Sequence, residues 1–192
     1  MSGERPFDEY ALRYDRWFDE NPGIFSAQVS GLRAMLPRTG RSLEIGTGSG
    51  RFAAALGIVH GVDPSFPLLT LARQREIRAV QGRVECLPYR SGSFDSVLMM
   101  AVICFISRPG PAFSEVYRVL LPGGILVLGF FERDGAIGLR ARRQDPPGRF
   151  FSHAVFRTLP EVKEYLSLAH LRVCTVHEDP EGFCCIRAKK TG

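Results

Sequence analysis

The sequence predicts an α/β protein built on a mostly parallel sheet, and three features of its pattern support this. Short apolar runs alternate with stretches of helical periodicity, as they do in consecutive β-α-β units. Residues 94–103, FDSVLMMAVI, are apolar almost throughout, which is typical of a strand that helices cover on both faces. No internal repeat or low-complexity tract divides the 192 residues, so we expect a single domain over residues 1–192.

The expected elements fall into three parts of the chain. Residues 1–40 form a helical cap that Asn21-Pro22-Gly23 interrupts, residues 41–131 form the core of the sheet, and residues 132–192 complete it. Strands are expected at 42–46, 58–63, 79–81, 94–103, 125–131, 171–176 and 183–188. Helices are expected over 7–20, 24–36 and 51–56, from Pro64 onward, over 111–120 and from Pro160 to Ala169, with a turn at 122–124 and a loop over 133–150.

Composition excludes some classes of protein and leaves others open. No window of about 18 residues is apolar throughout, so a transmembrane helix is not expected. The charged N-terminal segment lacks the apolar centre of a signal peptide, and the five Cys show no disulfide-like or metal-like spacing, which together favour the cytoplasm. The four His are scattered, so we expect no metal site. The net charge is +5, and the arginines over 133–149 could contact phosphate, although a solvated loop is the simpler explanation.

The segment LEIGTGSG, residues 43–50, carries the strongest functional signal. Its glycines lack a Cβ, so they permit a tight turn and a close approach of ligand to backbone. The segment joins an expected strand to an expected helix at the carboxyl edge of the sheet, where open α/β sheets bind ligands. Asp63 ends the next strand, 19 residues after Glu44, where a carboxylate can accept hydrogen bonds from both hydroxyls of a ribose. The two features together predict a nucleoside-containing ligand.

The pattern of the loop distinguishes between nucleoside ligands. A dinucleotide fingerprint, G-x-G-x-x-G, needs a third glycine where this chain has Arg51, which disfavours a nicotinamide oxidoreductase. Glu44 would be unfavourable beside a pyrophosphate. It suits a ligand that carries an ammonium and a sulfonium group, as S-adenosylmethionine does.

Four segments in order resemble motifs of the class I, Rossmann-like S-adenosylmethionine-dependent methyltransferases, in the branch of the ubiquinone and menaquinone methyltransferases. They are LEIGTGSGRFA, GVDPS, VQGRVECLPYRSGSFDSVLMM and FSEVYRVLLPGGILVLG, which span about residues 43–131. The resemblance implies a three-layer sandwich around a doubly wound, seven-stranded sheet of order 3-2-1-4-5-7-6, with the last strand antiparallel and the N-terminal helices as a cap. It also implies S-adenosylmethionine as the cofactor.

The resemblance assigns roles by position. Glu44 and residues 46–48 would face the methionine half of the cofactor, Asp63 would hold the ribose hydroxyls, and Leu68 and Val84 would contact the adenine. The full cofactor-binding set that it implies is Tyr14, Glu44, Gly46, Thr47, Gly48, Asp63, Pro64, Leu68, Val84, Glu85 and Met100.

Three of these assignments have a plain alternative. Met100 would offer a backbone carbonyl to the methionine amine, and Tyr14 would close over the cofactor from the cap. For both residues, and for Leu68, core packing is an alternative role.

The chain departs from the family pattern at two places. The acidic residue that usually precedes Val84 is Arg83, which cannot accept a hydrogen bond from the adenine amino group. A His that often follows the fourth strand is Phe105, which removes one candidate base. No catalytic base is therefore assigned; Tyr14, Glu85, Cys104 and His153 are the weak candidates.

The expected reaction is methyl transfer to an unidentified, small-molecule acceptor. The acceptor walls would come from the cap, the 104–110 loop and residues 132–153, although the same rings could form an ordinary core. They are Phe7, Trp17, Phe25, Phe105, Phe131, Phe150 and Phe151. Two alternatives stay open: a non-catalytic adenosylmethionine-binding regulator, and an RNA methyltransferase that uses Arg133–Arg149 as a phosphate contact. The sequence does not indicate the oligomeric state.

Overall fold

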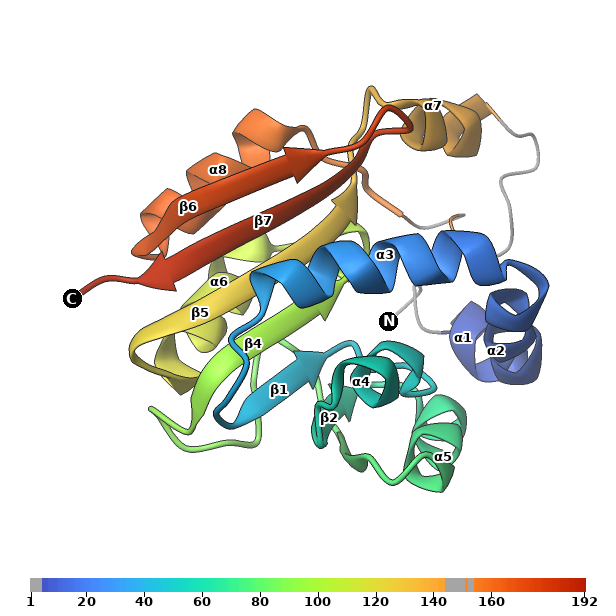
Figure 1. Cartoon of the computed structure of the whole chain (residues 1–192), viewed down its shortest axis with the longest axis horizontal. Coiled ribbons are helices and arrows are strands. Elements are labelled where there is room, and N and C mark those ends of the chain that lie inside the picture. The colour runs from blue at the N-terminus through green and yellow to red at the C-terminus, as the bar shows by residue number, and fades with distance from the viewer. Residues whose placement is uncertain (1–4, 144–150, 152–153) are drawn as a thin grey trace.

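A computed structural model describes residues 5–143, 151 and 154–192. Its seven strands form one sheet of order β3-β2-β1-β4-β5-β7-β6, in which β7 is antiparallel to both neighbours (Figure 1). The predicted fold class and strand order are therefore confirmed. The strands are β1 (Ser42–Ile45), β2 (His60–Asp63), β3 (Arg78–Gln81), β4 (Phe94–Met100), β5 (Leu120–Phe131), β6 (Leu171–Glu178) and β7 (Phe183–Lys190).

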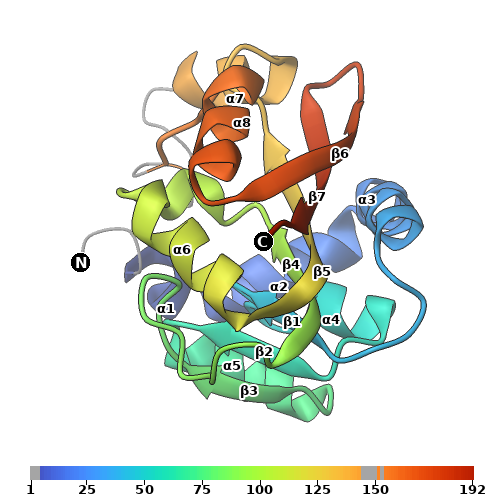
Figure 2. The ribbon, with the colours of Figure 1, turned by 90° about the vertical axis from the view of Figure 1, so that its left-hand side faces the viewer.

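Helices cover both faces of the sheet and give the molecule three layers (Figure 2). One apolar cluster packs α6 and α8 on one face through Phe113, Val116 and Val162, and a second packs α3 and α4 on the other through Leu32 and Phe52. The helices are α1 (Arg5–Glu9), α2 (Ala11–Glu20), α3 (Pro22–Met35), α4 (Arg51–Leu56), α5 (Phe66–Gln74), α6 (Pro109–Val119), α7 (Ala136–Arg143) and α8 (Leu159–Leu168). No helix of the described chain is long and apolar enough to cross a membrane.

Strand β4 is shorter than the sequence predicts. The apolar run continues to Ile103, but the strand ends at Met100 because Ala101 turns the backbone into the left-handed region, with a φ of 56°. A 3-10 turn, Ile103–Phe105, follows. Apolar character therefore extends beyond the strand into a buried loop at the carboxyl edge of the sheet.

Helix α5 begins two residues later than predicted. Ser65, not Pro64, caps the helix, and its hydroxyl accepts a hydrogen bond from the Leu68 N–H at 3.5 Å. The following Pro67 lies in the first turn, where its missing N–H costs nothing. Strand β2 is likewise confined to its last four residues and begins at His60.

Two further expectations about connections are corrected. Residues 122–124 are not a separate turn but part of β5, whose register against β4 shifts between Phe94 and Ser96. Part of the expected loop over 133–150 is the helix α7, while residues 144–150 lie outside the described chain. A carboxyl oxygen of Glu132 accepts the backbone N–H groups of Asp134 and Gly135 at 2.5 and 3.0 Å, and so organises the turn that leads into this helix.

The parallel strands bring their carboxyl ends to one edge, and the cap lies at that edge. Figure 1 shows α1 and α2 at the end of the molecule toward which β1, β4 and β5 point. Helix α1 contacts α5, and α2 contacts both α3 and α5. The N-terminal helices therefore lie beside the carboxyl ends of β1 and β4.

Candidate active site

The glycine-rich loop between β1 and α4 is a tight turn of bare backbone. Gly46, Gly48 and Gly50 all have positive φ, at 70°, 52° and 81°. The N–H groups of Gly46 and Thr47 both donate to the carbonyl of Val62, at 2.8 and 3.1 Å, which fixes the loop to strand β2. A Cβ at Gly46 would collide with the side chain of Val102. The conformation therefore requires glycine at this position.

Glu44 is a buried acid below the loop, with 1% of its surface exposed. Its Oε2 accepts a hydrogen bond from the Thr47 hydroxyl at 2.8 Å. Burial raises the pKa of Glu44 to about 8, although the bond from Thr47 opposes that shift. Gly61, opposite Glu44 on β2, makes room for Thr47, since a Cβ there would lie 2.7 Å from the threonine methyl carbon. Sequence reasoning missed this second requirement for glycine.

Asp63 ends β2 and faces the loop, not bulk solvent. Its Oδ2 accepts the Gly48 N–H at 2.8 Å, and its Oδ1 accepts the Ser65 N–H at 2.9 Å. The residue is 8% exposed, and burial raises its pKa to about 6 against the opposing effect of both hydrogen bonds. Two buried carboxyl groups thus flank the loop, an environment that favours a ligand with positive charge and hydroxyl donors.

Tyr14 and Leu68 meet at Gly48. A Cβ at Gly48 would lie 3.4 Å from the Tyr14 Cε1 and 3.9 Å from the Leu68 Cδ1. The Tyr14 ring also contacts Phe7 and Phe18 edge to face, at 5.5 and 5.3 Å between centroids. Burial, and then the negative charges of Asp63 and Glu44, raise the pKa of the Tyr14 phenol above its ordinary value. The cap therefore places a protonated phenol over the loop.

A charged cluster that the sequence did not reveal fastens the cap to the core. Arg51 donates to Asp15 at 2.9 Å and to Asp19 at 2.6 Å, and Arg75 donates to Asp15 at 2.8 Å. Burial would raise the pKa of Asp15, but the hydrogen bonds from the two arginines outweigh it and hold that pKa well below its usual range. In the sequence, Arg51 stands out only as the residue at a position where a dinucleotide-binding loop has glycine. The signal was Asp15 and Asp19 at i,i+4 spacing, which places two carboxylates on one face of α2.

The expected adenine side of the site follows β3. Val84 is 7% exposed and its side chain packs in the core, in a turn that the Cys86 N–H closes on the Arg83 carbonyl at 3.1 Å. Glu85 lies 3.6 Å from the Arg83 guanidinium. The preceding Gly82 donates its N–H to the Asp63 carbonyl at 3.1 Å, so this turn is tied to the ribose side of the loop.

Two other predicted positions have clear structural surroundings. The carbonyl of Pro64 accepts a hydrogen bond from the Gln81 amide at 2.9 Å. Met100 pairs with Gly129 on β5, where a Cβ would lie 2.8 Å from the Met100 sulfur. The strained Ala101 follows directly, held by its N–H bond to the Gly129 carbonyl at 2.8 Å.

The expected aromatic walls separate into two groups. Trp17 and Phe25 pack around Phe18, at 5.3 and 5.4 Å between centroids, and Phe25 also contacts Phe52 of α4. Four of the other rings join two that sequence reasoning missed, while Phe150 lies outside the described residues. We call this second group the edge cluster: Phe7, Phe105, Phe131, Phe151, Phe156 and Phe183.

A buried arginine braces the loop that carries Phe105. Arg157 is 7% exposed and donates to the carbonyls of Ile103, Val155 and Ile106, at 3.0, 2.8 and 2.7 Å. The Val155 N–H donates in turn to the Cys104 carbonyl at 2.7 Å. Nothing in the sequence around this arginine marked it, because two of its three partners are backbone carbonyls more than 50 residues away.

The weak candidates for a base fare differently. The Cys104 thiol lies within this braced loop and donates to the Ala101 carbonyl at 3.3 Å, and burial raises its pKa to about 12. Tyr14 is likewise held in its protonated form. Glu85 lies on the turn after β3, beside Arg83. His153 is outside the described residues.

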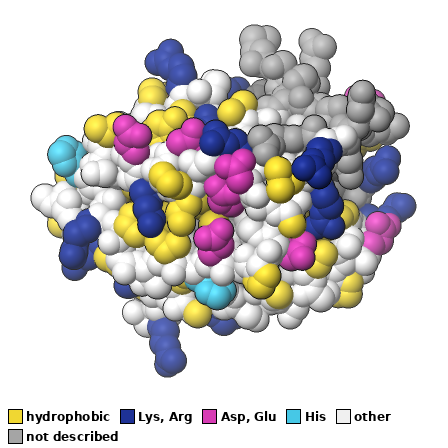
Figure 3. Space-filling view, turned by 90° about the horizontal axis from the view of Figure 1, so that it is seen from above, with side chains coloured by type: hydrophobic (Ala, Val, Ile, Leu, Met, Phe, Trp, Pro, Cys, Tyr) yellow, Lys and Arg dark blue, Asp and Glu magenta, His cyan; other side chains and the backbone are white. Residues whose placement is uncertain are grey.

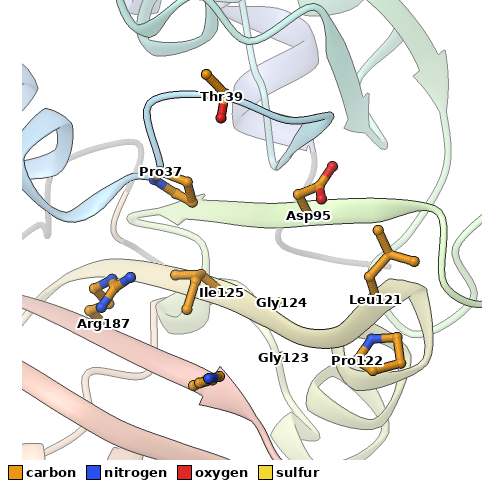
Figure 4. A pocket seen from close by; sticks show the side chains of 10 residues that line it. Pro37, Thr39, Asp95, Leu121, Pro122, Gly123, Gly124, Ile125 and Arg187 are labelled. Atoms are coloured by element: carbon orange, nitrogen blue, oxygen red, sulfur yellow. The ribbon is translucent and has the colours of Figure 1, made fainter.

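The opposite edge of the sheet holds an open hollow of about 390 Å³, separate from this site (Figure 4). Asp95 on β4 and two cations on β7, Arg187 and Lys189, line it together with Gly123 and Gly124. Asp95, Gly123 and Gly124 lie at the amino ends of β4 and β5, and the two cations lie at the carboxyl end of the antiparallel β7, all away from the glycine-rich loop. The hollow therefore does not belong to the predicted site.

The arginine-rich segment does not form a free basic stripe in the part that the structure describes. Arg133 pairs with Glu161 at 3.2 Å, and Arg140 pairs with Glu181 at 3.0 Å. Figure 3 shows basic and acidic side chains interspersed on the face seen from above. Arg149 lies outside the described residues. This arrangement lends no support to an RNA-binding role.

Known proteins resemble this chain over most of its length. A family model described as a methyltransferase domain matches residues 43–128. An uncharacterised protein of Methanocaldococcus jannaschii is 37% identical over 160 residues, which are 83% of this chain and 78% of that protein. A longer uncharacterised protein of Mycobacterium tuberculosis is 37% identical over 185 residues; the match covers 88% of this chain but only 62% of that protein. The structure superposes, with a TM-score of 0.90 and 29% identity, on a SAM-dependent methyltransferase of Thermotoga maritima described as a possible histamine N-methyltransferase, covering 98% and 100% of the two chains.

Proposed function

Because the chain belongs to the class I S-adenosylmethionine-dependent methyltransferases, we propose that it transfers the cofactor's methyl group to a small-molecule acceptor at the carboxyl edge of its sheet. The observation that carries this proposal is the pair of buried carboxyl groups, Glu44 and Asp63, on either side of a loop of bare backbone. The motifs quoted above also support a place in the ubiquinone and menaquinone branch. A single domain over residues 1–192 and a cytoplasmic location remain part of the proposal.

The residues around the loop fit the cofactor. Its ammonium group would lie near Glu44, a buried acid whose pKa is raised by burial and whose ionised form a nearby cation would stabilise. Asp63 would accept the ribose hydroxyls, and the backbone turn at Gly46 and Gly48, which has no side chains, would lie beside the methionine half. Leu68, Pro64, Val84 and Glu85 would bound the adenine and ribose, and Met100 would offer its carbonyl to the amine.

When bound, the cofactor supplies an activated methyl group on a sulfonium centre. The protein's own contribution is to hold the acceptor in line with that group and to exclude water. Holding the reactants in line can lower the activation free energy by on the order of 7–11 kcal/mol. Tyr14 would cover the cofactor from the cap, and the Arg51 cluster would hold the cap in place. The edge cluster would form the acceptor side, because it lies at the ends of β4 and β5.

Thermal unfolding in the presence of ligands tests the proposal. S-adenosylmethionine and S-adenosylhomocysteine at about 100 times Kd should each raise the unfolding free energy by about 2.7 kcal/mol, and NAD and NADP should not. Asp63→Ala should lose most of this stabilisation. Asp95→Ala is the matched control, since Asp95 also accepts a backbone N–H, from Arg41 at 2.8 Å, but at the opposite edge. Equal stabilisation of the two variants would refute the assigned site.

A further inference from the structure

The hollow at the amino edge of the sheet, opposite the predicted site, has one wall of cations. Arg187 and Lys189 lie two residues apart on β7 and both line the hollow, and residues at this spacing point to the same face of a sheet. Arg172 is opposite Lys189 in the register of β6 and β7, which adds a third positive charge on that face. Like charges directly opposite one another destabilise a pair of strands. A negative charge bound at this wall would therefore be stabilising.

No acid of the described chain neutralises this wall. None of the three cations forms an ion pair with a described residue, and helix α3, which packs on this face, has no acidic residue. Asp95 lies across the hollow on β4, and Figure 4 shows Ile125 and Gly124 of β5 between it and Arg187. Because neighbouring strands are about 4.8 Å apart, β4 and β7 are separated by about 10 Å. The acid and the cations therefore face each other across a gap that a small molecule can span.

The two cations that line the hollow have hydrogen-bond donors to spare. The Nε of Arg187 donates to the Met35 carbonyl at 3.1 Å, which anchors the guanidinium, while its two terminal nitrogens have no partner among the described residues. In Arg118, by contrast, the terminal nitrogens donate to backbone carbonyls at 2.7 and 3.1 Å. The ammonium of Lys190 likewise donates to two carbonyls at 2.8 Å, whereas that of Lys189 has no such bond within the described chain. Arg187 and Lys189 can therefore bind a ligand without giving up a contact.

Between these two walls the hollow is lined by backbone that leaves the regular ladder. The register of β5 against β4 jumps from Leu120 to Ile125, and its register against β7 begins only at Ile125. Residues 121–124 therefore have no register partner on either neighbour, and Gly123 and Gly124 add no side chains that would fill the space. Thr39 lines the hollow from the connection between α3 and β1. The volume of about 390 Å³ lies within the range of sites for small molecules.

We propose that this hollow binds a phosphate monoester whose organic part carries hydroxyl groups, at a site that goes beyond the proposed function and does not depend on it. The phosphate would lie between the forked donors of Arg187 and the point charge of Lys189. A monoester carries about 1.5 to 2 negative charges at pH 7, which matches two unpaired cations, whereas a carboxylate or a phosphodiester carries one. The hydroxyls would donate to Asp95, whose Oδ2 accepts the Arg41 N–H and whose Oδ1 has no partner among the described residues.

Calorimetric titration of the full chain in phosphate-free buffer tests this site, with ribose 5-phosphate as the probe. We expect it to bind one to one, at least threefold more tightly than inorganic phosphate and at least fivefold more tightly than gluconate, a polyol with one carboxylate. Failure of ribose 5-phosphate to bind would overturn the proposal, as would equal affinity for gluconate. Equal affinity for inorganic phosphate would overturn the assignment to a polyol. Saturating S-adenosylhomocysteine should leave the titration unchanged, and displacement of the probe would place it in the cofactor site instead.

Variants of the cation wall give a second, independent readout. Lys189→Met should weaken binding of ribose 5-phosphate at least fivefold, and Arg187→Lys, which keeps the charge but loses the forked donors, at least threefold. Lys163→Met removes the same charge from an exposed position on α8 and should bind as the wild type does. An equal loss in the Lys163 variant would show that net charge alone attracts the probe and would overturn the site. Tighter binding of a ten-nucleotide uridine RNA, weakened by Lys189→Met, would identify a nucleic-acid surface and overturn the proposal too.

Discussion

The two halves of the site are built by different means. The cofactor half, between β1 and α5, consists of backbone turns and two acids that lie within 20 residues of each other in the sequence. The acceptor half consists of side chains from both termini and the middle of the chain, joined by ring contacts and by the bonds of Arg157. The first half depends on where the backbone goes, and the second on which side chains happen to meet. Substitutions should therefore affect them differently.

The strictest test of the backbone half is a side chain at Gly46. Gly46→Val places a side chain at a left-handed φ and brings it into collision with Val102. The two effects together should lower the unfolding free energy by about 4 kcal/mol and should abolish stabilisation by S-adenosylmethionine. Gly31→Val makes the same change in helix α3, where a Cβ has nothing within 4 Å, and should shift stability by less than about 0.5 kcal/mol. Thermal unfolding with and without ligand measures both. A Gly46 variant as stable as the Gly31 variant would mean that the loop tolerates side chains.

The acceptor half should instead depend on one distant brace. Arg157→Met leaves three carbonyls without their donor, those of Ile103 and Ile106 in buried bonds, and should cost about 3 kcal/mol, or roughly 6–12 °C in Tm. Because the bonds run to the loop of Phe105, amide exchange should accelerate at Val155 and in residues 103–106, while S-adenosylhomocysteine still binds within about threefold. Arg157→Lys keeps a cationic donor and should recover part of the stability.

Exchange that accelerates equally in the glycine-rich loop would contradict this separation, because it would show that the brace supports the cofactor half too. Loss of protection from amide exchange that is confined to residues 103–106 and 155 would support the separation of the two halves.

This difference explains what the sequence could and could not predict. Glu44, the glycines and Asp63 lie in contiguous segments whose strand–loop–helix pattern fixes their relative positions, so their meeting was predictable. The edge cluster was predicted only in part. Trp17 and Phe25 are aromatic residues that were expected beside Phe105, but they pack against Phe18 instead. Periodicity shows that a ring is buried, and not which neighbour buries it.

The ion pairs that hold the cap could not be predicted from the sequence either. The ion pairs of Arg51 with Asp15 and Asp19 join residues 32 and more positions apart, and only the folded chain shows that they oppose each other. The fold class was accessible because it depends on the order of elements. The end of β4 was not, because the apolar run that predicts a strand continues through the left-handed turn at Ala101.

A third test concerns the two acids of the backbone half and the response of the protein's stability to pH. The pKa values of Glu44 and Asp63 are raised by burial to about 8 and about 6, so the folded protein binds their protons more tightly than the unfolded chain does. The stability that these protonated acids contribute is complete below about pH 4 and is lost as the pH rises through those two values. The protein without cofactor should thus be less stable at pH 8.5 than at pH 5.

Glu44→Gln separates the two acids. It should remove the decline above about pH 6 and part of the decline below it, and leave the part between about pH 4 and 6 that Asp63 causes. Glu20→Gln, at an exposed position on α2, is the control and should follow the wild-type curve. A cationic ligand favours the ionised form of Glu44, so the affinity for S-adenosylmethionine should rise over the same pH range in which the protein alone loses stability. Thermal unfolding from pH 5 to 9, with and without the cofactor, measures how the stability of the free protein and its affinity for the cofactor each change with pH. If both fell as the pH rises, Glu44 would not face the cofactor's positive charge.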